Sequence, residues 1–316
     1  MTQMQDGYFD SFRGMVNTWE CDDNAHMSVQ FYGARISEGA FYLRQALGLT
    51  PSVIRSSRRT MIAMEEHLRF HRELNAGDLI AMRSRLIDMR ENTLVVYHEL
   101  LNAGTGETAA TAVSVYGHFD LDSRKLVPWP DSAREKAKAL IGPLPDQAEA
   151  RSVKRETRLP DLTLDEATAR GFTEIYRGSV APQHCDEFGR MAAQFYISRI
   201  SDGVGHLWQS LGMDRQTMTA RRRGSVVLEQ RLNYVREVLS GDILIARSTI
   251  ADVAPKTVRF MHFMFNGETG LLVSTSEAVA ILLDLDTRRA TSFSDEERAR
   301  LTTHMHSVAS AASIPA

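Results

Sequence analysis

Residues 7–49 have the sequence GYFDSFRGMVNTWECDDNAHMSVQFYGARISEGAFYLRQALGL, and residues 171–213 have the sequence GFTEIYRGSVAPQHCDEFGRMAAQFYISRISDGVGHLWQSLGM. The second segment follows the first at an offset of 164 residues without a gap, and 18 of the 43 aligned positions are identical. A period of this length is far too long for a solenoid repeat, and only two copies are present. The pattern predicts a duplicated domain, with two half-chains packed as a pseudo-dimer whose clefts form a related pair.

The same offset continues beyond these segments as far as Arg124 and Arg288. Between them it aligns a glutamate, a glycine–aspartate pair and a histidine, which are Glu65 with Glu229, Gly77-Asp78 with Gly241-Asp242, and His98 with His262. The duplication therefore covers nearly the whole of each half.

Composition narrows the class of protein. The 316 residues suggest about two domains, and 43% hydrophobic residues allow each domain to bury a core. A net charge of −3 gives no electrostatic reason to expect nucleic acid or an anionic membrane surface as a partner. No apolar run approaches the roughly 20 residues that span a bilayer, and residues 1–10 lack the pattern of a signal peptide. The sequence therefore predicts a cytoplasmic enzyme or binding protein.

Only two cysteines occur, Cys21 and Cys185, and they occupy equivalent positions of the repeat. Two cysteines provide neither a disulfide framework nor a zinc site. No phosphate-binding glycine loop and no metal-binding His-Glu-x-x-His helix are present.

Each half begins with a predicted strand, a polar turn and a long helix. The strands are expected at residues 8–16 and 172–180, and the first turn at residues 21–26. Apolar residues then recur at spacings of three and four, which is the period of a helix, and the apolar arc is wide enough that most of the helix must be buried. Gly48 and Gly212 lie where such helices would end.

Four further strands are expected in each half, as an antiparallel meander against which the helix packs. Asn102–Gly106 and Asn266-Gly267 are hairpin signals between the last two strands of each half. The expected strands are residues 60–70, 79–88, 93–101 and 108–121 in the first half, and 225–234, 243–251, 257–265 and 271–285 in the second.

This organisation predicts an α+β protein with four segments. Residues 1–127 form the first domain, and residues 128–170 form a charged, proline-bearing linker with a helix near 132–141. Residues 171–300 form the second domain, and the Ala/Ser-rich residues 301–316 are expected to be disordered.

The chain resembles the hot-dog fold, in which an antiparallel sheet wraps a long central helix. More narrowly, it is similar to the 4-hydroxybenzoyl-CoA thioesterase-like acyl-CoA thioesterases. Many members carry Asp-x-x-Gly-His-(Met/Val) at the start of the central helix, followed by a tyrosine. The corresponding residues here are Asp22-Asp23-Asn24-Ala25-His26-Met27 with Tyr32, and Asp186-Glu187-Phe188-Gly189-Arg190-Met191 with Tyr196. The first copy has alanine in place of the glycine, and the second has arginine in place of the histidine.

The resemblance implies tandem hot-dog domains and thioester hydrolysis at a cleft between the halves. Asp22 and Asp186 would be the acting carboxylates, His26 would orient the carbonyl or assist proton transfer, and N–H groups at the helix start would stabilise the oxyanion. No cofactor is implied beyond the coenzyme A of the substrate. The remaining substrate-contacting candidates are Asn24, Tyr32, Gly189, Arg190 and Tyr196.

Each candidate also has a simpler explanation. Asp22 and Asp186 could instead cap the helices, and Arg190 could pair with Asp186 and depress its basicity. The cysteines suit burial better than a nucleophilic role. Glu38 and Asp202, in the middle of the helices, are second choices for the catalytic carboxylate, or helix-surface carboxylates at the seam of the pseudo-dimer.

Two further sets of residues could contact the substrate. Glu65 and Glu229 could line the cleft or pair with arginine. Arginine clusters before the long strands suit the phosphates of coenzyme A, with a solvated loop as the alternative. The clusters contain Arg55, Arg58 and Arg59 in the first half, and Arg221, Arg222 and Arg223 in the second.

Acyl-CoA thioesterase is therefore the expected function, with a small-molecule acyl thioester as partner. A hot-dog enoyl-CoA hydratase and a non-catalytic acyl-binding protein are the alternatives. The acyl group, the choice between coenzyme A and acyl carrier protein, and a homodimer of double hot-dog chains all stay open. Because His26 is replaced by Arg190, we expect the Asp22 cleft to do most of the chemistry and the Asp186 cleft to be weak or to serve binding.

Overall fold

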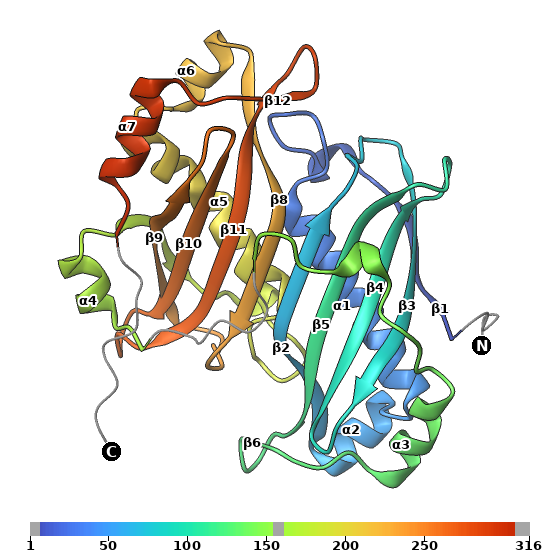
Figure 1. The fold of residues 1–316 in the computed structure, drawn as a ribbon. Coiled ribbons are helices and arrows are strands. Elements are labelled where there is room, and N and C mark those ends of the chain that lie inside the picture. Colours follow the sequence, from blue (N-terminus) through green and yellow to red (C-terminus); the bar gives the residue numbers. More distant parts are fainter. Residues whose placement is uncertain (1–6, 154–160, 307–316) are drawn as a thin grey trace. The chain divides into compact units, whose positions relative to one another are not determined.

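The computed structural model describes residues 7–153 and 161–306. These residues form two compact units, divided between Ala150 and Arg151. Each unit combines an antiparallel sheet with helices, as Figure 1 shows. In the described part of the chain, no helix is both long enough and apolar enough to cross a membrane.

The sheet of unit 1 has the strand order β1-β3-β4-β5-β2, with β6 beside β5, and the pairings between these strands are antiparallel. The five strands expected from the sequence are confirmed within one to two residues at each end. The bounds of the five are β1 (Phe9–Met15), β2 (Arg59–Phe70), β3 (Leu79–Met89), β4 (Thr93–Asn102) and β5 (Thr108–Asp120), and the structure adds the short strand β6 (Lys125–Leu126).

The prediction of a simple meander is wrong at one strand, because β2 pairs with β5 and not with β3. The N–H groups of His71 and Arg72 both donate to the carbonyl of Ala109, so the chain stays beside β5 after β2 ends. Residues 71–78 then cross the end of the sheet to reach β3. This connection is too long for a tight hairpin, and it passes the loop that precedes the long helix.

The long helix of unit 1, α1 (Val29–Ala46), contacts β1 and β3 and runs behind the strands in Figure 1. Gly39 permits this approach, since a Cβ there would collide with the side-chain end of Met82. Gly48 has a φ of +89° directly after the helix, as expected for a glycine that ends one. The other helices of unit 1 are η1 (Thr18–Glu20), α2 (Pro51–Ser57), α3 (Asp131–Lys138) and η2 (Asp146–Ala148).

Unit 2 repeats this plan with the strand order β8-β11-β10-β9-β7 and with β12 beside β11. Its long helix, α5 (Gln194–Ser210), contacts β7 and β9. Its strands are β7 (Thr173–Ser179), β8 (Arg223–Tyr234), β9 (Ile243–Val253), β10 (Thr257–Asn266), β11 (Leu272–Asp284) and β12 (Arg289–Thr291). Its remaining helices are α4 (Leu164–Ala169), η3 (Pro182–His184), α6 (Arg215–Ala220) and α7 (Asp295–Thr303).

The structural repeat extends beyond Arg124 and Arg288, where the repeat in the sequence ends. Helices α3 and α7 occupy equivalent positions and contact β3 and β9, respectively. After each helix the chain forms a parallel bridge to the sheet, Leu86 with Ile141 and Ile250 with Met305. Residues 128–150 of the segment expected as a linker therefore belong to unit 1.

Some predicted segments fall partly beyond the structure. Residues 154–160 of the expected linker and residues 307–316 of the expected disordered tail lie outside the described residues. Helix α7 includes Leu301–Thr303 of that tail. The bounds of the four predicted segments stay a prediction.

Each sheet buries one histidine against a serine. Ser84 Oγ lies 2.7 Å from His98 Nδ1 in unit 1, and Ser248 Oγ lies 2.7 Å from His262 Nδ1 in unit 2. Burial lowers the pKa of His98 to about 3 and that of His262 to about 4. Both rings are therefore neutral members of the core at physiological pH.

Candidate functional site

The loop before each long helix closes on itself in the same way. In unit 1 the Asp22 N–H donates to the His26 carbonyl at 2.9 Å, and the Ala25 N–H donates to the Asp22 carbonyl at 2.9 Å. Ala25 has a φ of +65°, and Gly189 at the equivalent position of unit 2 has a φ of +76°. Alanine therefore adopts the left-handed conformation that the family's glycine provides, and the turn is retained in both units.

A second backbone contact ties each loop to the segment after the long strand. The Met27 N–H donates to the Leu74 carbonyl at 2.7 Å, and the Met191 N–H donates to the Val238 carbonyl at 2.8 Å. This contact brings one glutamate, Glu73 or Glu237, beside each loop. The sequence prediction missed both, although their matched spacing of 164 residues was a signal that could have found them.

In unit 1, His26 lies between two carboxylates. Its Nε2 is 3.5 Å from Asp22 Oδ2, and its Nδ1 is 3.6 Å from Glu73 Oε1. The His26 side chain is 12% exposed, against 36% for Asp22 and 37% for Glu73. Asp22 Oδ1 accepts the Asn24 N–H at 2.8 Å, so the carboxylate is oriented with its other oxygen toward the ring. These groups are of the types that form an acid–base pair, at separations slightly longer than a hydrogen bond.

In unit 2, Arg190 takes the place of the histidine and binds Asp186 directly, as the sequence indicated. Its Nε and Nη2 donate to Asp186 Oδ2 at 3.0 and 2.6 Å, and its Nη1 is 3.6 Å from Glu237 Oε1. Asp186 Oδ1 accepts the N–H groups of Phe188 and Arg190 at 2.9 and 3.1 Å. Both oxygens of Asp186 are therefore engaged, one by the Arg190 guanidinium and the other by backbone N–H groups.

Neither aspartate caps a helix, so the capping explanation is wrong. Helix α1 begins at Val29 after the N-cap Ser28, and α5 begins after the N-cap Ala193. No side-chain bond from Ser28 caps α1. The first N–H groups of a helix have no partner within the helix and carry partial positive charge. In α1 these are the N–H groups of Val29 and Gln30, three and four residues beyond His26, and they suit a developing oxyanion.

Tyr32 and Tyr196 pack beneath these loops, in the core of their units. They are 3% and 4% exposed and lie edge-on to Phe70 and Tyr234 at centroid distances of 5.1 and 5.0 Å. Burial raises the pKa of both hydroxyls above the usual range. Both tyrosines therefore help to hold the start of the helix on the sheet, and a contact with substrate stays a prediction.

The two strand glutamates differ in their surroundings. Glu229 is buried and accepts the N–H groups of Arg151 and Ser152 at 3.0 and 2.7 Å, which is a structural role. Glu65 is half-buried beside a bulge in β2. A substrate contact for Glu65 stays a prediction.

The carboxylates in the middle of the long helices are paired with arginines one turn earlier. Glu38 Oε1 accepts from Arg35 at 3.1 Å, and Asp202 Oδ2 accepts from Arg199 at 3.2 Å. Both carboxylate side chains are 47% exposed. These contacts favour a helix-surface role over catalysis.

The same arginines contact different partners in the loop. Arg35 bonds to buried Glu20, whereas Arg199 Nη2 lies 2.8 Å from Nδ1 of His184 at the equivalent position. Burial and the Arg199 charge lower the pKa of His184. This histidine therefore serves as a neutral partner of arginine.

The cysteine thiols are unsuited to nucleophilic attack. Burial is the main cause that raises the pKa of both Cys21 and Cys185, so less thiolate is present at neutral pH. Across residues 7–153 and 161–306, no group of three or more His, Cys, Asp and Glu side chains could hold a metal ion.

The predicted phosphate-binding arginines are engaged by acidic residues of their own unit. Arg58 pairs with Asp122 at 3.1 Å and Arg59 with Asp120 at 3.2 Å, while Arg222 pairs with Asp286 at 2.6 Å. These pairs favour the alternative of a solvated, internally neutralised surface. Binding of coenzyme A by these arginines stays a prediction.

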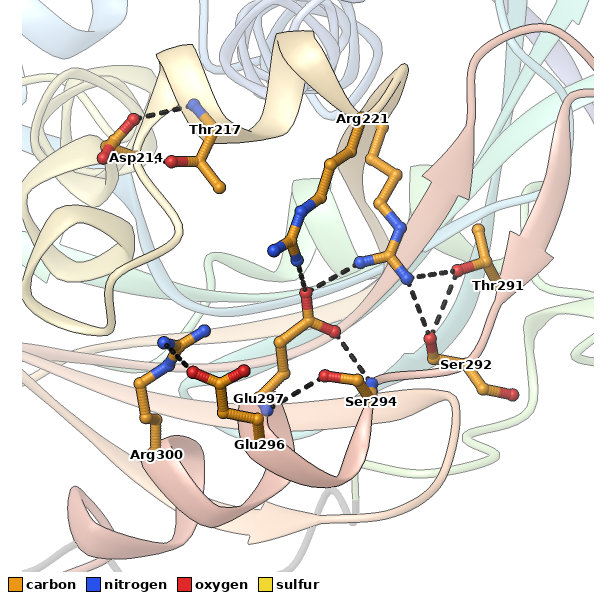
Figure 2. Close-up of polar contacts among 10 residues, drawn as sticks. Asp214, Thr217, Arg221, Thr291, Ser292, Ser294, Glu296, Glu297 and Arg300 are labelled. Atoms are coloured by element: carbon orange, nitrogen blue, oxygen red, sulfur yellow. Dashed lines mark hydrogen bonds and ion pairs between the residues drawn. The ribbon is translucent and has the colours of Figure 1, made fainter.

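The last of these arginines, Arg223, joins an ion cluster around Glu297. It donates to Glu297 Oε1 at 2.8 Å, and Arg221 donates to the same oxygen at 2.7 Å, as Figure 2 shows for Arg221. Burial raises the pKa of Glu297, but the Ser294 N–H and the two arginines outweigh it and leave the pKa below its usual range. The cluster fastens α7 to the start of β8.

Comparison with known proteins identifies the family. The model of the thioesterase-like superfamily matches twice, at residues 16–137 and 180–301. The two matches cover more than half of the chain, one in each unit. The chain therefore belongs to the thioesterase-like superfamily.

Two characterised relatives share part of the sequence. One is the L-carnitine dehydrogenase/betainyl-CoA thioesterase of Agrobacterium fabrum, 28% identical over 137 residues, which are 42% of this chain and 28% of that protein. The other is the betainyl-CoA thioesterase of Pseudomonas aeruginosa, 26% identical over 126 residues, which are 40% of this chain and 79% of that protein. The first relative is thus matched over less than a third of its length.

Two solved structures share the fold across both units. The 12:0-ACP thioesterase of Umbellularia californica has a TM-score of 0.66 at 14% identity, over 87% of this chain and 94% of its own. The acyl-ACP thioesterase of Bacteroides thetaiotaomicron has a TM-score of 0.63 at 12% identity, over 88% of this chain and 100% of its own. Together with the double family match, they confirm the predicted resemblance to double hot-dog thioesterases.

Proposed function

We propose that this protein hydrolyses an acyl-CoA thioester and that Asp22 and His26 carry out the chemistry. The observation that supports this assignment best is the approach of His26 Nε2 to Asp22 Oδ2 at 3.5 Å, on a loop that leads directly into α1. Membership of the thioesterase-like superfamily and two relatives named as betainyl-CoA thioesterases support thioester hydrolysis as the reaction.

The proposed reaction needs only groups of unit 1 and water. A water molecule attacks the thioester carbonyl carbon, and Asp22 accepts its proton, with His26 beside it to relay the proton. N–H groups at the start of α1 stabilise the oxyanion that forms. When the carbonyl reforms, the C–S electron pair leaves with sulfur, which takes up the proton, so the products are a carboxylic acid and the free thiol.

Several finer statements form part of this proposal. The sheet of each unit wraps its long helix, and the thioester occupies a cleft between the two halves. Coenzyme A enters as part of the substrate, with no separate cofactor. The salt bridge at Asp186 and Arg190 supports a weak catalytic role, or a role in binding, for the second loop.

A thiol-release assay tests the reaction class. The panel contains short, branched, aromatic and charged acyl groups, each as a coenzyme A and as an acyl carrier protein conjugate. Betainyl-CoA comes first because both relatives are named for it, and because Asp22 and Glu73 would attract its quaternary ammonium. We expect free thiol from at least one acyl-CoA.

The same panel separates the alternatives. Hydration of crotonyl-CoA without thiol release would replace the thioesterase assignment with a hydratase. Binding of acyl-CoA with neither reaction would identify a non-catalytic binding protein. Hydrolysis of carrier-protein conjugates alone would retain the reaction but change the substrate.

A further inference from the structure

We propose that Glu73 is a positioning residue for the reaction, and that it acts by holding the imidazole ring of His26. This inference rests on the proposed thioesterase function. It assigns a role to a residue that is distant in sequence from the family's aspartate–histidine motif.

The first support is the geometry around the ring. His26 Nδ1 is buried and lies 3.6 Å from Glu73 Oε1, while Nε2 on the other side lies 3.5 Å from Asp22 Oδ2. A histidine nitrogen that donates to a carboxylate fixes both the tautomer and the orientation of the ring. If the distance between Nδ1 and Glu73 Oε1 shortened slightly, Nδ1 would donate a hydrogen bond to Glu73. This bond would direct Nε2 toward Asp22.

The second support is the backbone that places Glu73 there. The loop is joined to residue 74 by the Met27 N–H, and the Asp22 N–H holds the His26 carbonyl. The backbone on either side of the contact is therefore fixed. The meeting of Glu73 and His26 does not depend on the position of a free loop.

The third support comes from unit 2, where the same two carboxylates surround a permanent cation. Arg190 contacts Asp186 at 2.6 Å and Glu237 at 3.6 Å. The paired carboxylates therefore form a site that suits a positive charge in both units. In unit 1 the occupant is a histidine, which carries that charge only while it holds a second proton.

This arrangement suggests a specific part for Glu73 in the proton transfer. The proton of the attacking water passes to Asp22 and from there to His26 Nε2, which makes the ring an imidazolium. Glu73 stabilises the positive charge from the Nδ1 side, in the position that the carboxylate has beside the histidine of a catalytic triad. When the C–S bond breaks, the proton returns through Nε2 to the leaving sulfur, and Glu73 keeps its own charge throughout.

Other charged groups lie near enough to affect a pH profile. Asp22 and Asp78 act electrostatically on both Tyr32 and Cys21, and Glu73 acts on Tyr32 while Glu20 acts on Cys21. Asp78 accepts the N–H of Asn75 at 2.8 Å. Asp22, Asp78 and Glu20 are unchanged in every variant of the test below, so a difference between Glu73→Gln and the wild type isolates Glu73.

The central test compares Glu73→Gln with Glu237→Gln, the matched change in unit 2. With the best acyl-CoA of the panel, we expect Glu73→Gln to lower kcat roughly tenfold to a hundredfold with KM nearly unchanged. The acid limb of the pH profile of kcat should also move in the Glu73→Gln variant. Glu237→Gln should leave kcat within about twofold and the profile in place, because Arg190 is charged at every pH used.

A double-mutant cycle shows whether Glu73 acts through His26. If it does, Glu73→Gln should cost almost nothing further in a His26→Asn background, because the ring that it holds is already gone. Glu73→Asp, which keeps the carboxylate on a shorter side chain, should restore part of the activity. Thermal unfolding of each variant identifies losses that come from folding.

Three outcomes would overturn the proposal: full activity of Glu73→Gln, equal losses from Glu73→Gln and Glu237→Gln, or additive losses with His26→Asn. If the wild-type chain releases no thiol from any acyl-CoA, the proposed function itself fails. An active wild type with an unaffected Glu73→Gln variant rejects only the role of Glu73.

Discussion

The loops at Asp22 and Asp186 have the same backbone and different chemistry. Both close through a hydrogen bond from the aspartate N–H to the carbonyl four residues on, at 2.9 and 2.7 Å. In unit 1 that fourth residue is His26, at 3.5 Å from its aspartate, and in unit 2 it is Arg190, at 2.6 Å. One side chain decides whether the aspartate faces a proton carrier or is neutralised by a fixed cation.

The two loops separate the part of the motif that forms the turn from the part that supplies the charged side chain. The turn survives with alanine or glycine at its left-handed position, residues 25 and 189. The charge pattern survives with histidine or arginine between two carboxylates. At this position unit 1 has a histidine, a side chain that can exchange a proton near neutral pH, whereas unit 2 has an arginine that stays charged. A comparison of matched variants can therefore separate stability from catalysis.

The largest effect is expected from the two aspartates. Asp22→Asn keeps the shape of the side chain but removes the proton acceptor, so kcat should fall by roughly a hundredfold or more. Asp186→Asn should lower kcat less than about threefold, because its carboxylate is already occupied by Arg190. Steady-state thiol release at saturating substrate measures both. Equal losses, or a larger loss from Asp186→Asn, would place the chemistry in the other unit.

For stability we expect the opposite order, with a larger loss from a change in the loop of unit 2, at Arg190, than in that of unit 1. Arg190→Met leaves Asp186 and Glu237 facing each other without their cation, and we expect the free energy of unfolding to fall by about 2 kcal/mol. This figure is below the value for a fully buried pair because the Asp186 side chain is 17% exposed. His26→Met should cost less, since the ring lies 3.5 and 3.6 Å from its carboxylates. Denaturant unfolding of both variants would contradict the prediction if His26→Met proved the more damaging.

The close approach of helix to sheet offers a comparison away from both loops. An alanine Cβ at position 203 would collide with the backbone carbonyl of Ile175, whereas at position 39 it would meet the movable end of the Met82 side chain. Gly203→Ala should therefore lower the unfolding free energy by about 1.5 kcal/mol. Gly39→Ala should change it by roughly 0.5 kcal/mol or less, as a small adjustment of packing. Equal losses in denaturant melts would show that the two helices are equally constrained.

The smallest effect concerns the buried histidines and depends on pH. Their folded-state pKa values, about 3 for His98 and about 4 for His262, lie below the unfolded value of about 6.5. The unfolded chain binds more protons in this window, so stability falls as pH drops from about 6.5. His98→Gln or His262→Gln should each reduce the slope of unfolding free energy against pH by up to about 1.4 kcal/mol per unit.

Unfolding titrations from about pH 3 to 6 measure this slope, and subtracting the variant's slope from that of the wild type removes the contribution of the carboxylates that both proteins share. An unchanged slope would mean that the histidine is not buried as a neutral ring. The effect of His98 should continue to a lower pH than that of His262.

Local patterns predicted much of this fold. Helix spacing located α1 and α5, alternation located the strands, and the repeat predicted that the second half copies the first. The partner of β2 was missed because pairing with β5 depends on where residues 71–78 cross the sheet, which no local pattern records. The short helices α2 and α6 were not predicted, because the segments near them were interpreted only through their arginines.

The candidate site was predicted only where its residues lie close together in the sequence. Asp22 with His26, and Asp186 with Arg190, are four residues apart, so a local motif contains each pair. Glu73 reaches His26 only through a tertiary contact at Leu74, and sequence spacing gave no distance between them. The arginines before β2 and β8 suggested a phosphate site because their acidic partners lie at the far end of another strand.

The closed loop has a consequence for how this chain could be altered. Residues 22–27 are closed by a backbone bridge between Cys21 and Met27, and the Met27 N–H binds them to the connection after β2. Residues 186–191 use the same bridge and the same anchor. Because these attachments are made by the backbone, we expect the six residues to be exchangeable between the two units. Exchange of the two segments would transplant the histidine into a unit whose glutamate already stands in place.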